Sequence, residues 1–238
     1  MGISTLYETK HKINDYITIR IPTVGEIMKN EDDYYRSVAL IVATPFDMMV
    51  QLDDMNIDFS KINDWDLFCL LFNELRTRDL SLIFDKLDLN EFVTAEDKKT
   101  GDIVLINPNT GAKIDQAIHD EICQYLRNIL HLQKNNKRPA NEEARKYLIE
   151  RARIKMKRRK KMLNDSQIEK YIIALVNTSE FPYNYETVLG LTIKQFYTSL
   201  HQIVKKIKYD NLMIGCYAGT VDMKELDQDE LNWISSNK

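Results

Sequence analysis

The sequence predicts a mainly α protein with a small antiparallel β element, the α+β class, from two observations. Apolar residues recur at helical spacing through the C-terminal half, whereas residues 80–114 hold short β-like runs separated by turn residues. The composition agrees with a folded chain, because 44% of the 238 residues are apolar and 29% are charged. The 7 Gly and 5 Pro are too few for a linker-dominated or fibrous sequence.

The first eighty residues combine one strand with several helices. Residues 16–21, YITIRI, are rich in β-branched side chains, which predicts a strand. Residues 33–44 show a helical pattern that Pro45 interrupts, and a second short helix is expected over residues 46–55 because Pro tolerates the first turn of a helix. The run LFCLLF over residues 67–72 is too bulky for a solvated face, so we expect it in the core.

The segment after residue 80 changes from helical to β-like spacing. The β-like runs are residues 81–84, 91–93 and 103–106. Gly101 and Gly111 lie in the turn-rich stretches that follow the second and third runs, where tight turns need left-handed or flexible backbone. We therefore predict a small antiparallel hairpin or meander over residues 91–114, joined by the strand at residues 16–21.

The chain is helical from Asp115 onward. One continuous apolar stripe is formed by Ile118, Ile122, Tyr125, Ile129 and Leu132. A further helix is expected from Asn141 to about residue 163. The patterns S-x-x-E at residues 166–169 and T-x-x-Q at residues 192–195 are capping boxes, which predict the starts of two more helices.

The charge is strongly divided along the chain, although 33 Lys and Arg against 36 Asp and Glu leave a formal net charge of only −3. Residues 1–100 hold 19 acids and 11 bases, whereas residues 134–161 hold 3 acids and 13 bases. We divide the chain into an N-terminal acidic region with helices and the β meander, residues 1–114, and a C-terminal helical region, residues 115–238, which contains the basic helix 141–163.

The basic helix ends in the most distinctive run of the sequence. Its candidate anion-binding or partner-binding residues are Arg151, Arg153, Lys155, Lys157, Arg158, Arg159, Lys160 and Lys161. The run is interpreted as a solvated helix end, as a segment docked on the acidic N-terminal region, as a site for another protein, or as a nucleic-acid site. No aromatic residue interleaves the run, which argues against recognition of single-stranded nucleic acid.

The sequence offers no catalytic motif, and we expect neither an enzyme nor a cofactor or metal site. The three cysteines, Cys69, Cys123 and Cys216, form no CxxC pair, which argues against a disulfide framework and a thiolate metal site. His119 lies one helical turn before Cys123, and we interpret the pair as a histidine on a helix face beside a half-buried cysteine. The adjacent carboxylates Asp53-Asp54 and Glu142-Glu143 point about 100° apart and are interpreted as solvated.

The expected location is the host cytoplasm, with the virion as a second possibility. The sequence begins without a basic and apolar leader, and the longest apolar run, residues 38–43, is far shorter than a membrane-spanning helix. We therefore expect neither secretion nor contact with a membrane.

The C-terminal end carries a second candidate site. Leu231, Trp233 and Ile234 follow the acidic stretch of residues 225–230. These apolar residues either fold back as a staple on the chain's own helices or serve as an anchor for a partner, because Trp is enriched at binding hot spots. The staple is favoured slightly, since residues 219–222 offer a turn that reverses the chain.

Several stretches resemble proteins of the tail modules of phages that infect gut and Gram-positive bacteria. They are IRIPTVGEI at residues 19–27, NEEARKY at residues 141–147 with the basic run after it, and YDNLMIGCYAGT at residues 209–220 with the ending LNW at residues 231–233. The proteins that they resemble are tail assembly chaperones and related minor tail proteins. The resemblance implies a mostly helical protein that binds the helical tape-measure protein until tail tube subunits enclose it, and it implies no catalytic residue.

A chaperone for a long amphipathic client needs apolar grooves with charged rims. The stripes of residues 115–133 and 192–208 either line such a groove or belong to the core. Two other classes compete with the chaperone: a structural virion component, such as a minor tail or connector protein, and a nucleic-acid-binding protein that acts through the basic helix. The oligomeric state is not specified by these patterns.

The nucleic-acid hypothesis predicts a salt-dependent affinity for duplex DNA. Replacing Lys157, Arg158, Arg159 and Lys160 with Gln should abolish that binding, because each lost phosphate contact removes about one unit from the slope of log affinity against log salt. We expect weak, nonspecific binding at most. If the unmodified protein does not bind duplex DNA at low salt, the nucleic-acid hypothesis is wrong.

Overall fold

The protein is mainly helical with two small antiparallel sheets in the described part of the chain, which confirms the α+β class. The computed structural model describes residues 5–98, 100–160, 166–227 and 231–234. The α-helices are α1 Val24–Met28, α2 Glu31–Ile41, α3 Met49–Asp54, α4 Asp64–Leu75, α5 Gln116–Ile129, α6 Glu142–Lys160, α7 Gln167–Val176 and α8 Ile193–Tyr217. The strands are β1 Lys10–Lys12, β2 Thr18–Arg20, β3 Val93–Glu96, β4 Ile103–Ile106 and β5 Lys113–Ile114. The 3₁₀ segments are η1 Thr5–Tyr7, η2 Leu89–Glu91, η3 Thr187–Gly190 and η4 Met223–Glu225.

The sheets confirm the predicted meander and correct the predicted pairing of the first strand. In the three-stranded sheet, β4 lies between β3 and β5 with the register Val93↔Ile106. Strand β2 instead pairs with β1, in the register His11↔Ile19, so the prediction that it joins the meander is wrong. The partner strand has the sequence Lys-His-Lys, which carries no β-strand pattern. The predicted run at residues 81–84 forms only an isolated bridge, Ile19↔Phe84.

One main hydrophobic core contains residues from both halves of the chain. Ile19, Phe92, Ile122 and Phe196 all belong to it and have 3% or less of their surface exposed. The stripe predicted on α5 faces this core except at Leu132, which lies beyond the end of the helix and is exposed, so the prediction is wrong for that residue. The division at residue 114 therefore separates regions of different charge whose residues share a core, and the division into two domains stays a prediction.

Two backbone segments far apart in sequence are tied together at the centre of the molecule. Thr23 and Thr192 form an isolated antiparallel bridge, in which Val24 N donates to Leu191 O at 2.9 Å and Ile193 N donates to Pro22 O at 2.8 Å. We call this pairing the Thr23–Thr192 bridge. Gly25 lies against the same connection, because a Cβ there would approach Leu189 O to 3.1 Å. The bridge joins the start of α1 to the start of α8.

Each of the two bridge threonines is also the N-cap of a helix. The Thr23 hydroxyl accepts from Glu26 N, and the Glu26 carboxylate accepts from Thr23 N. Gln195 and Thr192 form the same reciprocal pair at α8, as the sequence predicts. The backbone hydrogen bond from Thr23 holds the pKa of Glu26 below its ordinary value, and the Arg20 guanidinium contributes to the same shift.

The start of α7 is capped partly by a distant residue. Ser166 Oγ accepts from Glu169 N at 3.0 Å, in agreement with the predicted N-cap. The carboxylate of Glu31, at the start of α2, accepts from Gln167 N and Ile168 N. A residue more than a hundred positions earlier therefore supplies the anion that favours this helix N-terminus.

The predicted core run on α4 is largely confirmed. Leu67, Phe68 and Phe72 are buried, whereas Leu70 lies on the outer side of the helix and is exposed. A bulky run of six residues covers more than one side of a helix, so one member faces solvent when a single face packs on the core.

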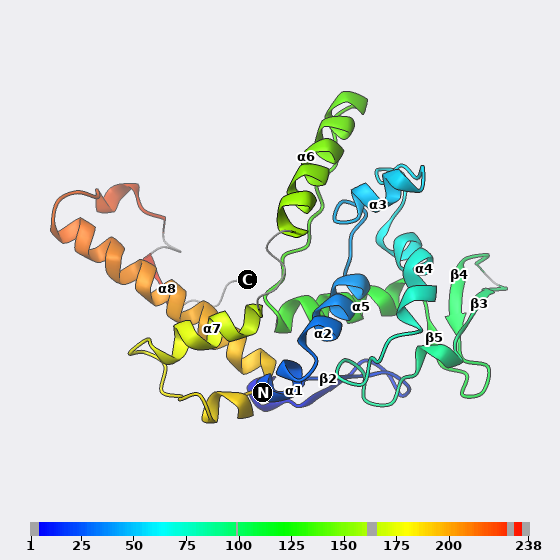
Figure 1. Cartoon of the computed structure of the whole chain (residues 1–238), viewed down its shortest axis with the longest axis horizontal. Helices are drawn as coiled ribbons and strands as arrows, with labels where there is room; N and C mark the ends of the chain where they lie inside the picture. Colours follow the sequence, from blue (N-terminus) through cyan, green and yellow to red (C-terminus); the bar gives the residue numbers. More distant parts are fainter. Residues whose placement is uncertain (1–4, 99, 161–165, 228–230, 235–238) are drawn as a thin grey trace.

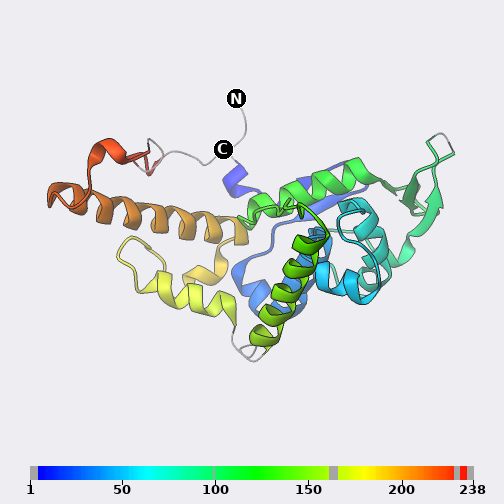
Figure 2. The same ribbon diagram turned by 90° about the horizontal axis from the view of Figure 1, so that it is seen from above.

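Helix α8 extends from the body of the molecule as an arm. Figures 1 and 2 show it leaving the main body, with the C-terminal segment running back along it. Ile193 and Phe196, at its first turn, are its buried residues. No helix in the described ranges is both long enough and apolar enough to span a membrane.

The packing of α8 predicts a steep difference in stability between its two ends. Phe196→Ala should lower the free energy of unfolding by about 3–5 kcal/mol, because it leaves a cavity in the core. Tyr217→Ala, at the exposed end of the same helix, should change it by less than about 0.5 kcal/mol. Urea unfolding followed by circular dichroism measures both, and equal effects of the two substitutions would contradict this packing.

Candidate functional site

The basic helix predicted for residues 141–163 is observed as α6, and the structure shows why it begins where it does. Asn141 Oδ1 accepts from Ala144 N at 2.8 Å, which caps the first turn. Glu142 lies in that turn, where a carboxylate favours the positive end of the helix, and it binds Arg145 through two hydrogen bonds. Residues 161–165, which include the predicted site residue Lys161, lie outside the described residues.

One face of α6 packs on α3 and on the loops beside it. Ile149 is buried, and Leu148, Ala152 and Met156 are partly buried in the same cluster. This cluster is separate from the main core and is completed by residues of α3 and its flanks, which include Met49, Leu52 and Phe59. In Figure 1 the helix stands up from the body beside α3.

The acidic residues on and beside α3 pair with two arginines of α6. Arg153 Nη2 lies 2.7 Å from Asp53 Oδ2 and 2.6 Å from Asp54 Oδ1, and Arg145 lies 3.8 Å from Asp58. The Asp53 and Asp54 side chains stay 38% and 59% exposed, in agreement with the prediction of solvated carboxylates. The sequence did not predict that one nitrogen, Arg153 Nη2, contacts both of them.

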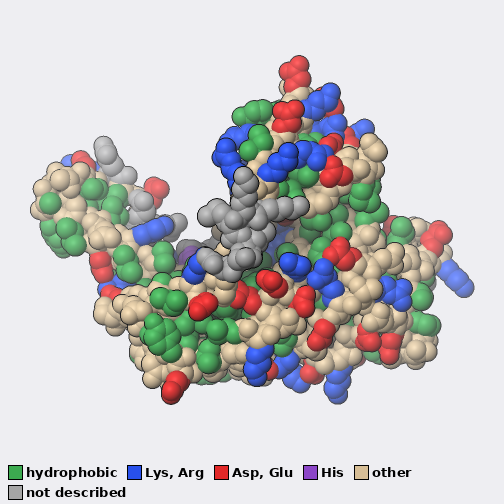
Figure 3. Space-filling model, in the orientation of Figure 1, with side chains coloured by type: hydrophobic (Ala, Val, Ile, Leu, Met, Phe, Trp, Pro, Cys, Tyr) green, Lys and Arg blue, Asp and Glu red, His purple; other side chains and the backbone are tan. Residues whose placement is uncertain are grey.

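Other basic residues of α6 face solvent. Arg151, Lys155, Lys157 and Arg158 are exposed, and no carboxylate among the described residues lies within 4 Å of their nitrogens. The Arg151 guanidinium lies over the Tyr147 ring, 5.6 Å from its centroid. Figure 3 shows Lys and Arg side chains over the upper part of the molecule, where α6 stands. The structure places Arg159 and Lys160 in the last turn of α6.

An open groove separates part of α6 from the segment that leads into α3. It has a volume of about 590 Å³ and is lined by Phe46, Met49, Leu148, Arg151, Ala152, Ile154, Lys155 and Arg158. We call it the α3–α6 groove. Its floor is apolar, and the three basic side chains come from one wall. The basic residues of this wall are among the site residues predicted from the sequence. Phe46 and Met49, which lie about a hundred residues earlier, were not predicted.

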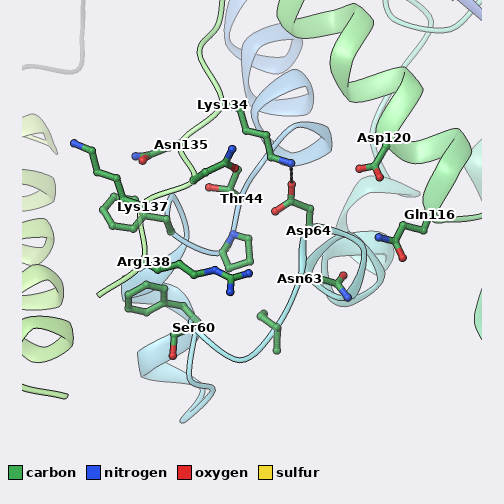
Figure 4. Close-up of a pocket in the computed structure, with 15 residues that line it drawn as sticks. Thr44, Ser60, Asn63, Asp64, Gln116, Asp120, Lys134, Asn135, Lys137 and Arg138 are labelled. Atoms are coloured by element: carbon green, nitrogen blue, oxygen red, sulfur yellow. Dashed lines mark ion pairs between the residues drawn. The ribbon is translucent and has the colours of Figure 1, made fainter. Parts of the chain in front are cut away.

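A second, more polar pocket lies beneath the linker between α5 and α6. It has a volume of about 260 Å³, and Figure 4 shows Lys134 reaching Asp64 and the Arg138 guanidinium pointing into the pocket, whereas the Lys137 side chain points away from it. Lys134 is neutralised by Asp64, whose Oδ2 lies 2.6 Å from Lys134 Nζ. The pocket thus holds an internal ion pair that ties the linker to the start of α4.

The His119–Cys123 pair is buried more deeply than the sequence indicates. Cys123 Sγ lies 3.2 Å from His119 Nε2, and both atoms contact the Ile41 carbonyl oxygen. Burial raises the pKa of Cys123 to about 12 and lowers the pKa of His119. Both groups are therefore neutral at pH 7, and this pair does not supply a thiolate nucleophile.

The C-terminal candidate residues lie beside the arm. Gln202 Nε2 donates to Trp233 O at 2.7 Å. Leu231 and Trp233 are partly buried, whereas Ile234 is 72% exposed. Val221 packs on Gly215, where a Cβ would lie only 2.9 Å from Val221 Cγ2. The last described segment thus contacts α8 at both of its ends.

The arm exposes an apolar row that begins about two turns beyond its buried root. Its exposed apolar residues are Val204, Ile207, Ile214 and Tyr217. Ile214 is 66% exposed and Tyr217 84% exposed. Figure 3 shows hydrophobic side chains gathered at the far end of the arm. The stripe predicted for residues 192–208 is thus core at its beginning and open surface afterwards.

Comparison with known proteins supports a phage origin. Residues 157–238, about a third of the chain, match the model of the YomV second domain, a phage-derived family. The matched segment contains the end of α6, all of α7 and α8, and the C-terminal residues. No curated protein and no solved structure matches the chain.

Truncation after Asp227 distinguishes the two predicted roles of the C-terminal residues. If Trp233 and its neighbours act as a staple, the truncated protein should melt several degrees lower, at about 2–4 °C per kcal/mol of lost stability. If they act as an anchor, its melting temperature should barely change while partner capture is lost. The matched control ends after Ile234 and should behave as the full chain, and unchanged stability with unchanged capture would refute both roles.

Proposed function

We propose that this protein is a non-enzymatic phage assembly protein, a tail assembly chaperone that binds a helical segment of the tape-measure protein. The observation that carries the proposal is the open apolar row on α8. The resemblance of several stretches to phage tail-module proteins and the phage-derived family match over residues 157–238 support the same assignment.

The row on α8 has the spacing that helix-to-helix binding requires. Val204 and Ile207 are three positions apart, Ile214 follows after seven, and Tyr217 after three more. At about 100° per residue, Ile207 and Ile214 share one side of the helix, and Val204 and Tyr217 each lie about 60° to either side of them. At 1.5 Å per residue they span about 20 Å, which is enough for four turns of a client helix. Single exposed apolar residues are common on soluble proteins, but four on one half of an extended helix, interrupted by Asn211, form a surface that suits an interaction site.

The surroundings of the row suit a long client that is later released. Lys208 is exposed beside the apolar side chains, and Asn211 lies between Ile207 and Ile214, so the contact surface is apolar with polar groups at its edge and within it. A row of four apolar side chains gives a modest contact area, which is compatible with exchange of the client for tube subunits. The arm extends from the body, so a client can approach it along its length (Figure 2).

Co-expression with the tape-measure protein of the same phage tests the proposal. The tagged protein should capture the tape-measure protein, and the variant Ile207→Ser with Ile214→Ser should lose at least tenfold of that capture. The matched control, Lys208→Ser with Lys224→Ser, changes two exposed polar positions that are not part of the apolar row and should retain capture. Equal capture by both variants would show that the apolar row is not the binding surface.

Mass spectrometry of purified phage particles separates the chaperone from the structural alternative. A chaperone leaves the assembly, so the protein should be absent from mature particles while it is abundant in the lysate. Stoichiometric presence in the particle would assign it instead as a minor tail or connector protein.

A further inference from the structure

The α3–α6 groove combines an apolar floor with a basic wall, and we propose that it binds an acidic amphipathic helix of a partner protein. The groove is a different surface from the row on α8 and lies on different elements. This inference does not depend on the tail-chaperone proposal.

The basic residues of α6 include one group that pairs with acids and another that lines the groove. Arg145 and Arg153 point to the acids at Asp53, Asp54 and Asp58, which neutralise them. The basic residues that line the groove, Arg151, Lys155 and Arg158, have no carboxylate within 4 Å among the described residues. The chain therefore satisfies the arginines of the packed face and leaves the groove wall with three positive charges.

The three positive charges of the groove wall are regularly spaced along α6. Arg151, Lys155 and Arg158 stand at positions i, i+4 and i+7, so they follow one side of α6 over about 10 Å. A helix lying along α6 presents carboxylates at the same spacing when Glu or Asp occupy its own positions i, i+4 and i+7. Charge complementarity with such a helix fixes its register and excludes a basic helix.

The floor of the α3–α6 groove is apolar and suits the apolar side of a helix. Phe46, Met49 and Leu148 line the groove together with Ala152, and its volume of about 590 Å³ lies in the range of binding pockets. Met49 belongs to a cluster that also contains Met48 and Met156. Methionine side chains are flexible and polarisable, so they adapt to the apolar side chains of an inserted helix.

The apolar floor also decides between a protein and a nucleic acid. Phosphates require cations and hydrogen-bond donors but gain nothing from Phe46, Met49 and Leu148. A helix with carboxylates beside an apolar stripe satisfies the wall and the floor together. The partner that fits is therefore an acidic amphipathic helix.

Fluorescence anisotropy with defined peptides tests the inference on the full chain. The probe is a fluorescein-labelled 18-residue helical peptide with Leu along one face and Glu at i, i+4 and i+7 beside it. One comparison peptide replaces each Glu with Gln, a second replaces each Leu with Ser, and a 20-base-pair DNA duplex represents nucleic acid. The Leu/Glu peptide should bind more tightly than all three.

The protein variants locate the binding. The triple variant Arg151→Gln, Lys155→Gln and Arg158→Gln should weaken binding of the Leu/Glu peptide about tenfold, as expected for three exposed ion pairs. The matched control Lys137→Gln, Arg138→Gln and Lys157→Gln removes the same charge outside the groove and should stay within about twofold of the unmodified protein. All substituted side chains are exposed, so both variants should keep the unmodified melting temperature.

Three results would overturn the inference: no binding of the Leu/Glu peptide at 100 μM, an equal loss in the two triple variants, or tighter binding of the DNA duplex that only the groove variant abolishes. The last result would assign the groove wall to nucleic acid. Each outcome is independent of capture of the tape-measure protein by α8, so the two proposals fail separately.

Discussion

The Thr23–Thr192 bridge is the constraint on which the arrangement of the molecule depends. Two backbone hydrogen bonds join the segment before α1 to the segment before α8, across a separation of 169 positions. Each threonine is at the same time the N-cap of its helix, and loss of an N-cap costs about 0.5–2 kcal/mol. Loss of either threonine side chain therefore weakens the start of its own helix, next to the backbone hydrogen bonds that join the two segments.

The bridge makes the exposed arm possible. Because Ile193 and Phe196 are buried next to it, the first turn of α8 is fixed in the core while the rest of the helix extends outward. A rigid helix that is held at one end presents its apolar row in a defined direction (Figure 1). The row would be a liability in a protein with no partner, since exposed apolar surface promotes aggregation.

The arm and the α3–α6 groove belong to different parts of the chain. The family match begins at residue 157, so it contains the arm and excludes α3 and most of α6. The groove is formed by a helix that crosses this boundary and by residues near position 46. The molecule thus carries an apolar surface on the segment that matches the YomV second domain, and a basic surface with an apolar floor formed mostly by the part that precedes it.

The sequence by itself determined the local structure of this protein. The capping box at Thr192 and Gln195 was predicted correctly, and so was the stripe on α5 apart from Leu132, because these features involve residues within a few turns of one helix. The meander at residues 91–114 was predicted for the same reason, since its turns and strands are neighbours in sequence.

Only the tertiary structure decided which surfaces are open and which charges are free. Strand β2 pairs with Lys10–Lys12, whose sequence has no strand pattern, and Arg153 pairs with acids a hundred positions earlier. The apolar stripe of α8 looks uniform in sequence, yet its first turn is buried and its far end is solvated. Periodicity shows that a helix has an apolar side, but burial depends on what lies opposite, which is set by contacts between distant segments.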